Sequence, residues 1–437
     1  MVVKKEIITK IKRNIPNHIL QLLYTAGELA DSLNVKIFMV GGSVRDLLLS
    51  QYISDLDLVV EGDGIQFAYA LAKELKGILK RVHRRFGTAV VMTVDGLRVD
   101  VASARTEFYE HPGALPNVKF SSLKQDLFRR DFTINALAVK INRRDFGVLL
   151  DFFNGLEDIK NKKIRILHNS SFVDDPIRIF RAIRFEQRFG FTIEKQTEEL
   201  LKLAVIDGFI KRLSSQRIIA ELMHILEEPK PEECFNRLLK LNIFEQISPL
   251  LVWNEQFYDY FIKARESFKY LSSELNVPQI SFKQLYLQIW LFKMDYQSIE
   301  KIGKMFGLSN KEIDRIGSLN SRLNYAIRKL TVSSYLPNSQ IYAELSQFSF
   351  IEQIILFSIA DKKEILLSRL KVYYDKFVHL KPNLNGNDLI GLGFKPGPLL
   401  GKCLVELKKN KLDDKLTSRE EEIRFALEFL SQNKDGA

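Results

Sequence analysis

The feature that most constrains the fold is an abrupt change in hydrophobic periodicity within the first half of the chain. Short runs rich in β-branched residues occur at 35–42, 54–60, 88–96 and 97–104, with a helical pattern among them at 64–76. Such runs predict strands, whereas apolar residues at three- and four-residue spacing predict amphipathic helices. The strand signals stop after about Lys140, or slightly later at 148–153, and helical periodicity dominates from Asp174 onward. We therefore expect an α+β fold, in which a mixed sheet with helices precedes a long all-helical region.

The length of the chain predicts several domains, because 437 residues exceed what one hydrophobic core usually organises. We expect an N-terminal domain over 1–145, which includes helices before the first strand, and helical domains over 146–225, 226–330 and 331–437. A segment rich in glycine, proline and asparagine at 381–401 interrupts the last helices. Ser418 and Glu421 have the spacing of a capping box at a helix start.

Composition favours a polyanionic partner. Lys and Arg number 65 against 54 Asp and Glu, a formal net charge of +11. A basic surface of this kind suits nucleic acid, although a lysine-rich proteome would explain the excess equally well. Two distant cysteines give no disulfide framework, and no apolar run approaches the length of a membrane span. We expect a soluble, cytoplasmic protein without a membrane partner.

The strongest chemical signal lies at 41–60, GGSVRDLLLSQYISDLDLVV. Glycines including Gly42 end a strand and precede a helix that contains Arg45, so backbone N–H groups and a guanidinium can face a phosphate. Asp55 and Asp57 are two residues apart on a strand and therefore point to the same face. Two carboxylates on one face can bind one or two Mg²⁺ ions, although exposed acidic alternation would look the same.

This segment resembles the DNA polymerase β nucleotidyltransferase superfamily, and within it the family of class II tRNA nucleotidyltransferases and bacterial poly(A) polymerases. The resemblance implies a five-stranded head, catalytic metal ligands at Asp55 and Asp57, and a nucleoside triphosphate near Gly42 and Arg45. It also implies a third carboxylate on a later strand, for which Asp100 is the candidate; the alternative is a plain edge-strand aspartate.

Two further segments match motifs of the same family. RRDFTINALAV, at 129–139, implies that Arg130 contacts the triphosphate and that Asp131 contributes to ribose recognition. From the residues alone, adjacent arginines could equally solvate a helix start. DFFNGLEDIKNKKIR, at 151–165, joins the head to a helical neck in the family, and we expect it to have a structural role.

The segment VDDPIRIFRAIRF, at 173–185, resembles the base-selecting motif of the family. Pro176 suits the first turn of a helix, with Asp174 or Asp175 near its cap. Asp175 and Arg178 would then lie one turn apart on one side, as an acceptor next to a donor. Cytosine and adenine carry an amino group beside an unprotonated ring nitrogen, whereas uracil and guanine present the opposite arrangement. One protein pair could thus select C and A without a template; the alternative is an ordinary surface ion pair.

Arg181 and Arg184 continue along the same predicted helix. By resemblance we expect both to contact phosphates. His83, in RVHRRFGTA, is expected at the surface, with a place in the groove of the head as the alternative.

The resemblance implies a function: template-independent addition of CCA to the 3′ end of tRNA, with CTP and ATP as substrates and Mg²⁺ as cofactor. The expected partner is tRNA, and no DNA partner is expected. Addition of CC only, addition of A only with a partner enzyme, and poly(A) synthesis would use the same residues. The loop at 103–122 is where related enzymes govern the switch from C to A. The alternative from another class is a catalytically silent tRNA-binding chaperone.

Overall fold

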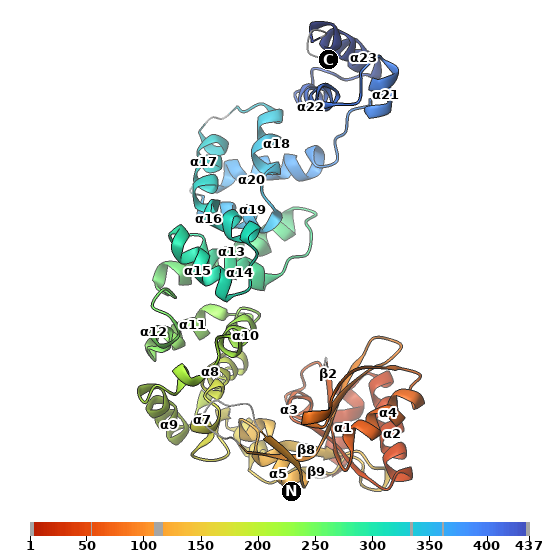
Figure 1. Ribbon diagram of the computed structural model, residues 1–437, viewed down its shortest axis with the longest axis vertical. Coiled ribbons are helices and arrows are strands. Elements are labelled where there is room, and N and C mark those ends of the chain that lie inside the picture. The colour runs from red at the N-terminus through yellow and green to blue at the C-terminus, as the bar shows by residue number, and fades with distance from the viewer. Residues whose placement is uncertain (1–3, 54, 109–116, 333–334, 361, 434–437) are drawn as a thin grey trace. The chain divides into compact units, whose positions relative to one another are not determined.

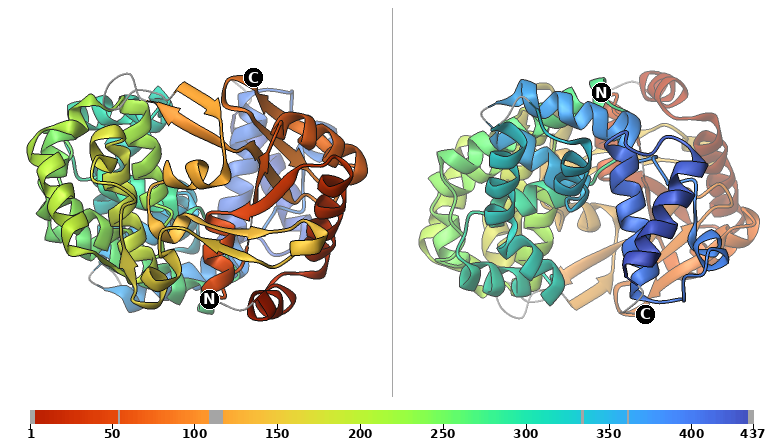
Figure 2. Two further views of the ribbon diagram at one scale, coloured as in Figure 1. Left: turned by 90° about the horizontal axis from the view of Figure 1, so that it is seen from below. Right: turned by 90° about the horizontal axis from the view of Figure 1, so that it is seen from above.

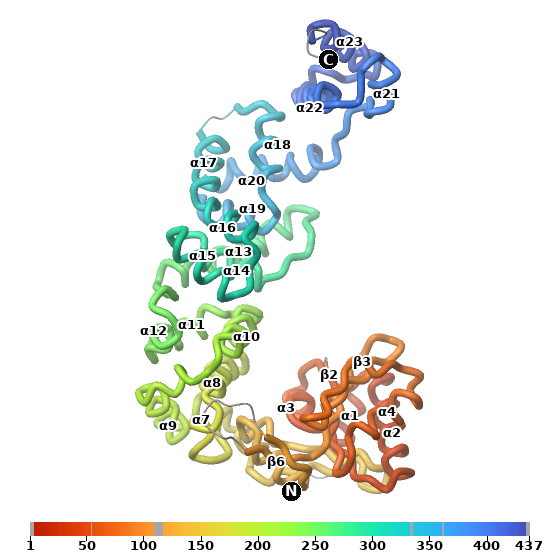
Figure 3. The backbone as a smooth tube through the Cα atoms, viewed as in Figure 1, coloured from red at the N-terminus to blue at the C-terminus, as the bar shows by residue number. Residues whose placement is uncertain are grey.

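The protein comprises two compact units, Met1–Leu251 and Val252–Ala437. The computed structural model describes residues 4–53, 55–108, 117–332, 335–360 and 362–433. Figure 3 traces the chain from the strands near the N-terminus through successive helices to the C-terminal region. Within these residues, no helix combines the length and apolarity that crossing a bilayer requires. The finer division at 145, 225 and 330 stays a prediction.

A seven-stranded mixed sheet organises the first part of unit 1 (Figure 1), with strand order β3-β4-β5-β2-β1-β8-β9. Only β2 and β5 run parallel; the other neighbouring pairs are antiparallel. The resemblance implied a sheet of five strands in the head, and the structure has seven. Two strands after residue 136, β8 and β9, extend the sheet beyond β1. The strands are β1 (Lys36–Val40), β2 (Asp55–Glu61), β3 (Ile78–His83), β4 (Thr88–Met92), β5 (Arg98–Ser103), β8 (Leu137–Lys140) and β9 (Leu149–Asp151).

Two small sheets lie outside this one. β6 (Arg105–Phe108) pairs with β7 (Asn117–Phe120), and β10 (Lys163–Ile164) pairs in parallel with β11 (Thr192–Ile193). β9 lies within the strand signal at 148–153, whereas β10 and β11 are short strands in the region expected to be all-helical after residue 145. Part of the loop assigned to the C-to-A switch, at 109–116, lies outside the described residues.

Helices including α4 cover one face of the main sheet, and α5 covers part of the other. Alternating residues of the central strands, such as Leu56, Leu58 and Val99, are buried, whereas the residues between them are partly accessible. α4 packs on the buried face against β4 and β5, and its start is capped by Asp63, which accepts from Ile65 N and Gln66 N. Figure 1 shows α2 next to α4. The helices of this part are α1 (Lys4–Asn14), α2 (Asn17–Ser32), α3 (Gly42–Leu48), α4 (Gly64–Glu74) and α5 (Leu123–Phe128).

The rest of unit 1 is mainly helical and is organised by α8. This helix packs against α10 and α11 through an apolar stripe that includes Ile179, Phe180 and Ile183, and it ends at Gly190 in the left-handed conformation, φ 62°. The helices are α6 (Gly155–Lys160), α7 (Ser171–Asp174), α8 (Ile177–Phe189), α9 (Lys195–Ile206), α10 (Ser215–Ile225), α11 (Pro231–Lys240) and α12 (Ile243–Ile247).

Unit 2 contains helices throughout its described residues. Its core includes Trp290, Tyr286 and Phe261, and near the C-terminus α22 packs against α23 (Figure 2, blue). The predicted capping box of Ser418 and Glu421 is confirmed at the start of α23. The helices are α13 (Glu255–Glu274), α14 (Phe282–Leu291), α15 (Tyr296–Met305), α16 (Asn310–Gly317), α17 (Leu319–Thr331), α18 (Asn338–Ser346), α19 (Phe350–Ile359), α20 (Lys363–Val372), α21 (Gly386–Gly391), α22 (Pro398–Leu412) and α23 (Arg419–Gln432).

Candidate active site

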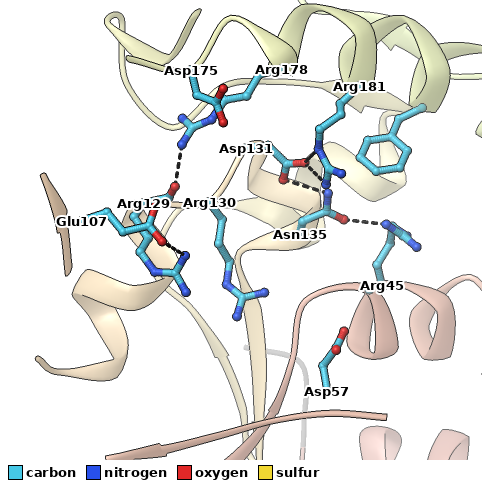
Figure 4. A pocket seen from close by; sticks show the side chains of 12 residues that line it. Arg45, Asp57, Glu107, Arg129, Arg130, Asp131, Asn135, Asp175, Arg178 and Arg181 are labelled. Carbon is cyan, nitrogen blue, oxygen red and sulfur yellow. Dashed lines mark hydrogen bonds and ion pairs between the residues drawn. The ribbon is translucent and has the colours of Figure 1, made fainter. Parts of the chain in front are cut away.

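A cavity of about 380 Å³ in unit 1 gathers most of the predicted site residues. It lies where β2 and α3, the segment between α5 and β8, and the start of α8 meet (Figure 4). Asp55, Asp100 and Arg184 are not among the described residues that line it. The lining consists of Gly42, Arg45, Asp57, Glu107, Arg129, Arg130, Asp131, Asn135, Asp175, Arg178, Arg181 and Phe185.

The three predicted carboxylates lie on neighbouring strands. Asp57 and Asp100 are directly opposed in the parallel β2–β5 pairing, and Asp55 is two residues earlier on β2, where it is exposed. Asp100 forms an ion pair with Arg98, with 2.7 Å between Oδ2 and Nε. In the part of the chain that the structure describes, no three His, Cys, Asp or Glu side chains already form a metal-binding group.

The charged form of the Asp57 carboxylate is destabilised in this structure, and a bound cation would stabilise it. Burial raises the pKa of Asp57 to about 6; the charge of Arg130 opposes this rise, and the charges of Asp100 and Asp55 add to it. Unneutralised carboxylate oxygens of this kind are the donors that a hard divalent cation prefers. The residues present therefore fit a metal such as Mg²⁺.

The start of α3 fixes β2 beside the cavity through a residue that sequence reasoning missed. Ser43 Oγ donates to Asp55 O at 3.1 Å and accepts from Asp57 N at 3.0 Å. Gly41 has φ 65°, and a β-carbon there would collide with Arg130 Nη1. The left-handed conformation favours glycine at this turn, and a β-carbon there would displace the end of the Arg130 side chain.

The two adjacent arginines are held by buried acids. Asp126 is fully buried, and its carboxylate accepts from Arg129 and, at 3.1 Å, from Arg130. Glu107, on β6, also accepts from Arg129, at 2.7 Å. Arg130 Nε is buried without a hydrogen-bond partner among the described residues. Such an orphaned donor calls for a ligand or water, and the contact of Arg130 with a triphosphate stays a prediction.

Asp131 holds other side chains of the cavity in place. Its Oδ1 accepts from Asn135 Nδ2 at 2.9 Å, and its Oδ2 accepts from Arg181 Nε at 2.8 Å and Nη2 at 2.5 Å. Asn135 Oδ1 in turn accepts from Arg45 Nη1 at 2.7 Å. Burial alone would raise the pKa of Asp131, but the charge of Arg181 and the hydrogen bonds from Asn135 and Arg181 lower it to about 2.

The contribution to ribose recognition that was expected of Asp131 stays a prediction, and the contacts of its side chain indicate how Asp131 acts in the cavity. Its side chain is buried, and both carboxylate oxygens already accept hydrogen bonds. The geometry favours a positioning role, in which Asp131 orients Arg181 and, through Asn135, Arg45.

The acceptor and the donor of the predicted base-selecting pair both line the cavity, but they are not on one helix. Asp175 has an extended backbone, φ −138° and ψ 92°, between α7 and α8, and α8 begins only at Ile177. Both oxygens of Asp175 accept from Arg217 Nη2, at 2.8 and 3.0 Å. Pro176 immediately precedes α8. Of the two acids expected near the cap, Asp174 belongs to α7, whereas Asp175 lies beside the start of α8 and its Oδ1 accepts from Ile177 N at 3.4 Å.

Arg178 is anchored in the first turn of α8. Its Nη1 donates to Ser171 Oγ at 2.6 Å and its Nη2 donates to the carbonyl oxygen of Arg129 at 2.7 Å. These bonds fix the plane of the guanidinium. Because a guanidinium has five N–H donors, others remain for a ligand.

Arg184 does not line the cavity. The predicted contact of Arg184 with a phosphate is wrong, because two buried acids already bind its guanidinium. Its side chain is buried, with Nε bound to Glu221 at 2.6 Å and Nη1 to Glu228 at 3.2 Å. The two acids come from α10 and the turn after it, so Arg184 joins α8 to its neighbours. Its role in the fold is structural.

Sequence reasoning missed Glu107, Arg129, Asn135 and Phe185 as lining residues. Asn135 and Phe185 lie within the motifs at 129–139 and 173–185. The polar side chain of Asn135 and the aromatic ring of Phe185 were only weak indications of a place in the site. Phe185 stacks under cations, with its ring centre 5.4 Å from Arg45 Cζ and 5.2 Å from Arg181 Cζ. Glu107 is also bound to Arg105, two residues before it, but the contact that brings it to the cavity is with Arg129, 22 residues away, which no local pattern indicates.

Comparison with known proteins first gives the class of protein that this fold and cavity define. Residues 37–165 match the family model described as the poly A polymerase head domain. Residues 190–253 match the model described as the probable RNA and SrmB-binding site of polymerase A.

Individual relatives extend the match over nearly the whole chain. An A-adding tRNA nucleotidyltransferase of Halalkalibacterium halodurans is 31% identical, over 98% of this chain and 96% of its own. One of Geobacter sulfurreducens is 37% identical over 97% of this chain, and this chain spans 48% of its length. The CCA-adding enzyme of Thermotoga maritima in complex with tRNA has a TM-score of 0.73 and 32% identity, and the match covers 97% of this chain and 98% of that one. The chain therefore belongs to the family of class II tRNA nucleotidyltransferases and bacterial poly(A) polymerases.

Proposed function

We propose that the protein adds nucleotides, without a template, to the 3′ end of tRNA. One observation carries the proposal: a single cavity is lined both by Asp57, beside its neighbouring carboxylates, and by the pair Asp175 and Arg178. A carboxylate centre for nucleotidyl transfer and an acceptor–donor pair for a base edge would thus face the same nucleotide. The net charge of +11 supports a polyanionic partner.

Asp55 and Asp57 would hold the divalent metal, with Asp100 as a third carboxylate beside them. Bound there, Mg²⁺ would lower the pKa of the attacking 3′ hydroxyl and neutralise charge on the departing pyrophosphate. The 3′ oxygen forms a bond to the α-phosphorus while the bond from that phosphorus to the bridging oxygen breaks. The hydroxyl proton passes to a nearby carboxylate, for which Asp100 is the candidate.

The cationic side chains of the cavity orient the triphosphate. Arg130, with its orphaned Nε, is the direct contact, and Arg45 and Arg181 are held in place by Asn135 and Asp131. Charge-assisted hydrogen bonds from such fixed donors are stronger and more directional than those from mobile lysines. The triphosphate is thereby aligned with its α-phosphorus near Asp57.

Asp175 and Arg178 select the base. The carboxylate accepts from the exocyclic amine of adenine or cytosine, and the guanidinium donates to the adjacent ring nitrogen. Uracil and guanine would leave both groups unpaired, at about 1–3 kcal/mol for each unmade bond. The bonds from Arg217 to Asp175 and from Arg178 to Ser171 and Arg129 support this role, because they fix both groups before a nucleotide arrives.

ATP is the nucleotide that the relatives support most broadly. The relatives at 37%, 31% and 34% identity are A-adding enzymes, and CCA-adding enzymes of Enterococcus faecalis and Lactobacillus helveticus are each 27% identical. Because both activities include the terminal adenosine, we propose ATP as a substrate in either case. CTP is a substrate if the protein adds the whole CCA, as the sequence led us to expect.

The test uses purified protein, Mg²⁺ and three tRNAs: one without CCA, one ending in C and one ending in CC. ATP and CTP are supplied separately, and Asp57→Asn serves as the inactive control. Extension of the third tRNA by ATP alone indicates an A-adding enzyme, and additional extension of the first two by CTP indicates CCA addition. Long adenosine tails would indicate poly(A) synthesis. Absence of extension in every combination would refute the proposal and favour a silent tRNA-binding protein.

A further inference from the structure

A second cavity, of about 290 Å³, adjoins the candidate active site on the accessible face of the main sheet. It shares Asp57 and Arg130 with the first cavity and is otherwise lined by strands β2 to β5 and by Val40. His83 lines it while remaining exposed, so both expectations for this histidine hold. The shared residues are the carboxylate next to the proposed metal and the cation proposed for the triphosphate.

The register of the sheet defines the floor of this cavity. Asp57 opposes Asp100, Asp100 opposes Val90, and Val90 opposes Arg81, so these residues form one row across four strands. The next row contains Val59, Ala102, Thr88 and His83. Since residues two apart on a strand share a face, both rows belong to the face that carries Asp57.

Much of this face is left uncovered by other elements. α5 covers its β1 end, where Leu123 and Leu127 form a buried cluster with Phe38, Val40 and Val59. Further along, Val90, Thr88 and Ala102 are only half-buried, and α4 occupies the opposite face. An apolar strip bordered by cations and acids therefore stays accessible beside Asp57.

We propose that this second cavity holds the 3′-terminal nucleotide of the RNA being extended, and that Arg81 binds the phosphate on the 5′ side of that nucleotide. The inference rests on the proposed function, since it assigns the acceptor's place in the same reaction. Nucleotidyl transfer has two substrates that must meet at one carboxylate centre, and these two cavities meet at Asp57. The first already contains the base-selecting pair, which leaves the second for the acceptor.

Arg81 is the cation of this cavity that is available for a phosphate. Arg98 is bound to Asp100, and Arg130 is bound to Asp126 and reaches into the first cavity. Among the described residues, no ion pair engages Arg81, which is exposed on the edge strand β3. Its Cα lies three strand spacings from that of Asp57, about 14 Å. A terminal nucleotide can span this distance, with its 3′ hydroxyl at the acids and its phosphate toward the arginine.

The remaining lining suits a nucleoside rather than a free anion. Val90 and Ala102 offer an apolar floor for a sugar or base, Thr88 a hydroxyl, and His83 a ring on which a base can stack. Among the described lining residues, Asp100 and Arg98 are an acceptor next to a donor, but they are bound to each other, and Asp100 is the candidate that takes the hydroxyl proton, so we do not expect them to select a base. The subsite should therefore tolerate either C or A at the end of the acceptor.

The test measures AMP addition by the full-length protein to tRNA ending in CC, with the Arg81→Ala variant and two controls. Lys80→Ala removes the same charge from the adjacent residue of β3, which is exposed and does not line the cavity. Arg81→Lys keeps the positive charge but lacks the planar guanidinium and its paired N–H donors. We expect Arg81→Ala to raise the KM for tRNA about tenfold, with the KM for ATP unchanged, because a charge-assisted bond to phosphate is lost. Lys80→Ala should stay within twofold of wild type, and Arg81→Lys should recover part of the loss.

A substrate with a neutral methylphosphonate between its last two nucleotides identifies the phosphate. The wild-type KM for this tRNA should rise about tenfold, and Arg81→Ala should add no further loss. The inference would be overturned if wild type and Arg81→Ala had equal KM values for ordinary tRNA, or if the losses from Arg81→Ala and from the methylphosphonate were additive. In either case, AMP addition by the wild type would leave the proposed function standing. Absence of both AMP and CMP addition by the wild type would refute the proposed function and this inference with it; if only CMP is added, the same comparison of KM values is made with CTP and tRNA lacking CCA.

Discussion

The central side chain in the candidate active site is Asp131, and its replacement by asparagine tests the reasoning most directly. Asp131→Asn keeps the shape of the side chain but removes the charge that pairs with Arg181. The pKa of Asp131 lies at about 2, against an ordinary value of 3.8. This difference corresponds to about 2 kcal/mol of unfolding free energy at neutral pH. For a unit of this size, a loss of that amount lowers the unfolding temperature by about 4–8 °C.

The two units can be followed separately in the same experiment. The only two tryptophans of the sequence, Trp253 and Trp290, both belong to unit 2. Hydrogen exchange of peptides from β1 and β2 reports on unit 1, and tryptophan fluorescence reports on unit 2. We expect Asp131→Asn to lower the transition of unit 1 and to leave the tryptophan transition unchanged. Asp145→Asn, which breaks an exposed ion pair with Lys140, should change neither.

The pH dependence gives the sign of the effect. Because the folded-state pKa of Asp131 is depressed, its contribution is complete above the ordinary pKa and is lost as pH falls from about 4 toward 2. The stability difference between wild type and Asp131→Asn should therefore shrink to about half near pH 3. A difference that is the same at pH 7 and pH 3, or an unchanged unit 1 transition at pH 7, would refute the charge-based account of this carboxylate.

Three other substitutions separate catalysis, base selection and structure. Asp57→Asn should lower kcat by about 10³-fold or more, because a ligand of the catalytic metal is lost, while the Kd for tRNA stays within twofold. Single-turnover AMP addition measures the rate and filter binding measures the Kd. Turnover within tenfold of wild type would contradict the assignment of Asp57 as a metal ligand. Arg178→Ala should reduce the preference for ATP over GTP by roughly 5- to 150-fold, the equivalent of 1–3 kcal/mol, in competition assays; unchanged rejection of GTP would argue against the pair. Arg184→Ala should lower the unfolding temperature of unit 1, because Glu221 loses the cation bound at 2.6 Å and Glu228 keeps only the more distant Arg188 among the described residues. The KM for ATP of the folded protein should stay unchanged, and a raised KM would restore a direct role for Arg184.

Local patterns were sufficient to predict the elements that carry the motifs. The run at 54–60 predicted β2, because β-branched and alternating residues fit a half-buried strand, and Ser418 with Glu421 predicted the start of α23. Local spacing also indicated Gly42, Asp57 and the pair of Asp175 with Arg178 as site residues, whereas Arg130 was assigned by the resemblance to the family. In each case the chemistry depends on residues close together in the sequence or on a motif of the family.

Long-range pairing could not be predicted in the same way. No local signal indicates that β2 runs parallel to β5 with Asp57 opposite Asp100, because register depends on the packing of both strands. The partners of Arg184 lie 37 and 44 residues away, so a buried structural arginine looked like another member of a cationic helix face. The same holds for Asp131, whose partner Arg181 is 50 residues away.

Besides the aromatic contact of Phe132 with Phe185, ionic and polar contacts join the head to α8 at the cavity, and these have a consequence for nucleotide affinity. Arg181 is bound to Asp131, and Arg178 is bound to the carbonyl of Arg129. A triphosphate that recruits Arg181 must compete with Asp131, so binding exchanges one set of hydrogen bonds for another and gains less than the number of donors suggests.

Asp131→Asn therefore has two opposite effects on the KM for ATP. It frees Arg181 for the triphosphate, which lowers the KM, and it weakens the orientation of Arg181 and of Arg45 through Asn135, which raises it. We expect a rise of about tenfold, because two cations lose their fixed positions while only one gains a free donor, and a fixed donor contributes about 1.4 kcal/mol more than a mobile one. Steady-state measurements at a temperature below the unfolding transition decide the sign. A lower KM would mean that Asp131 restrains Arg181 rather than positioning it for the substrate.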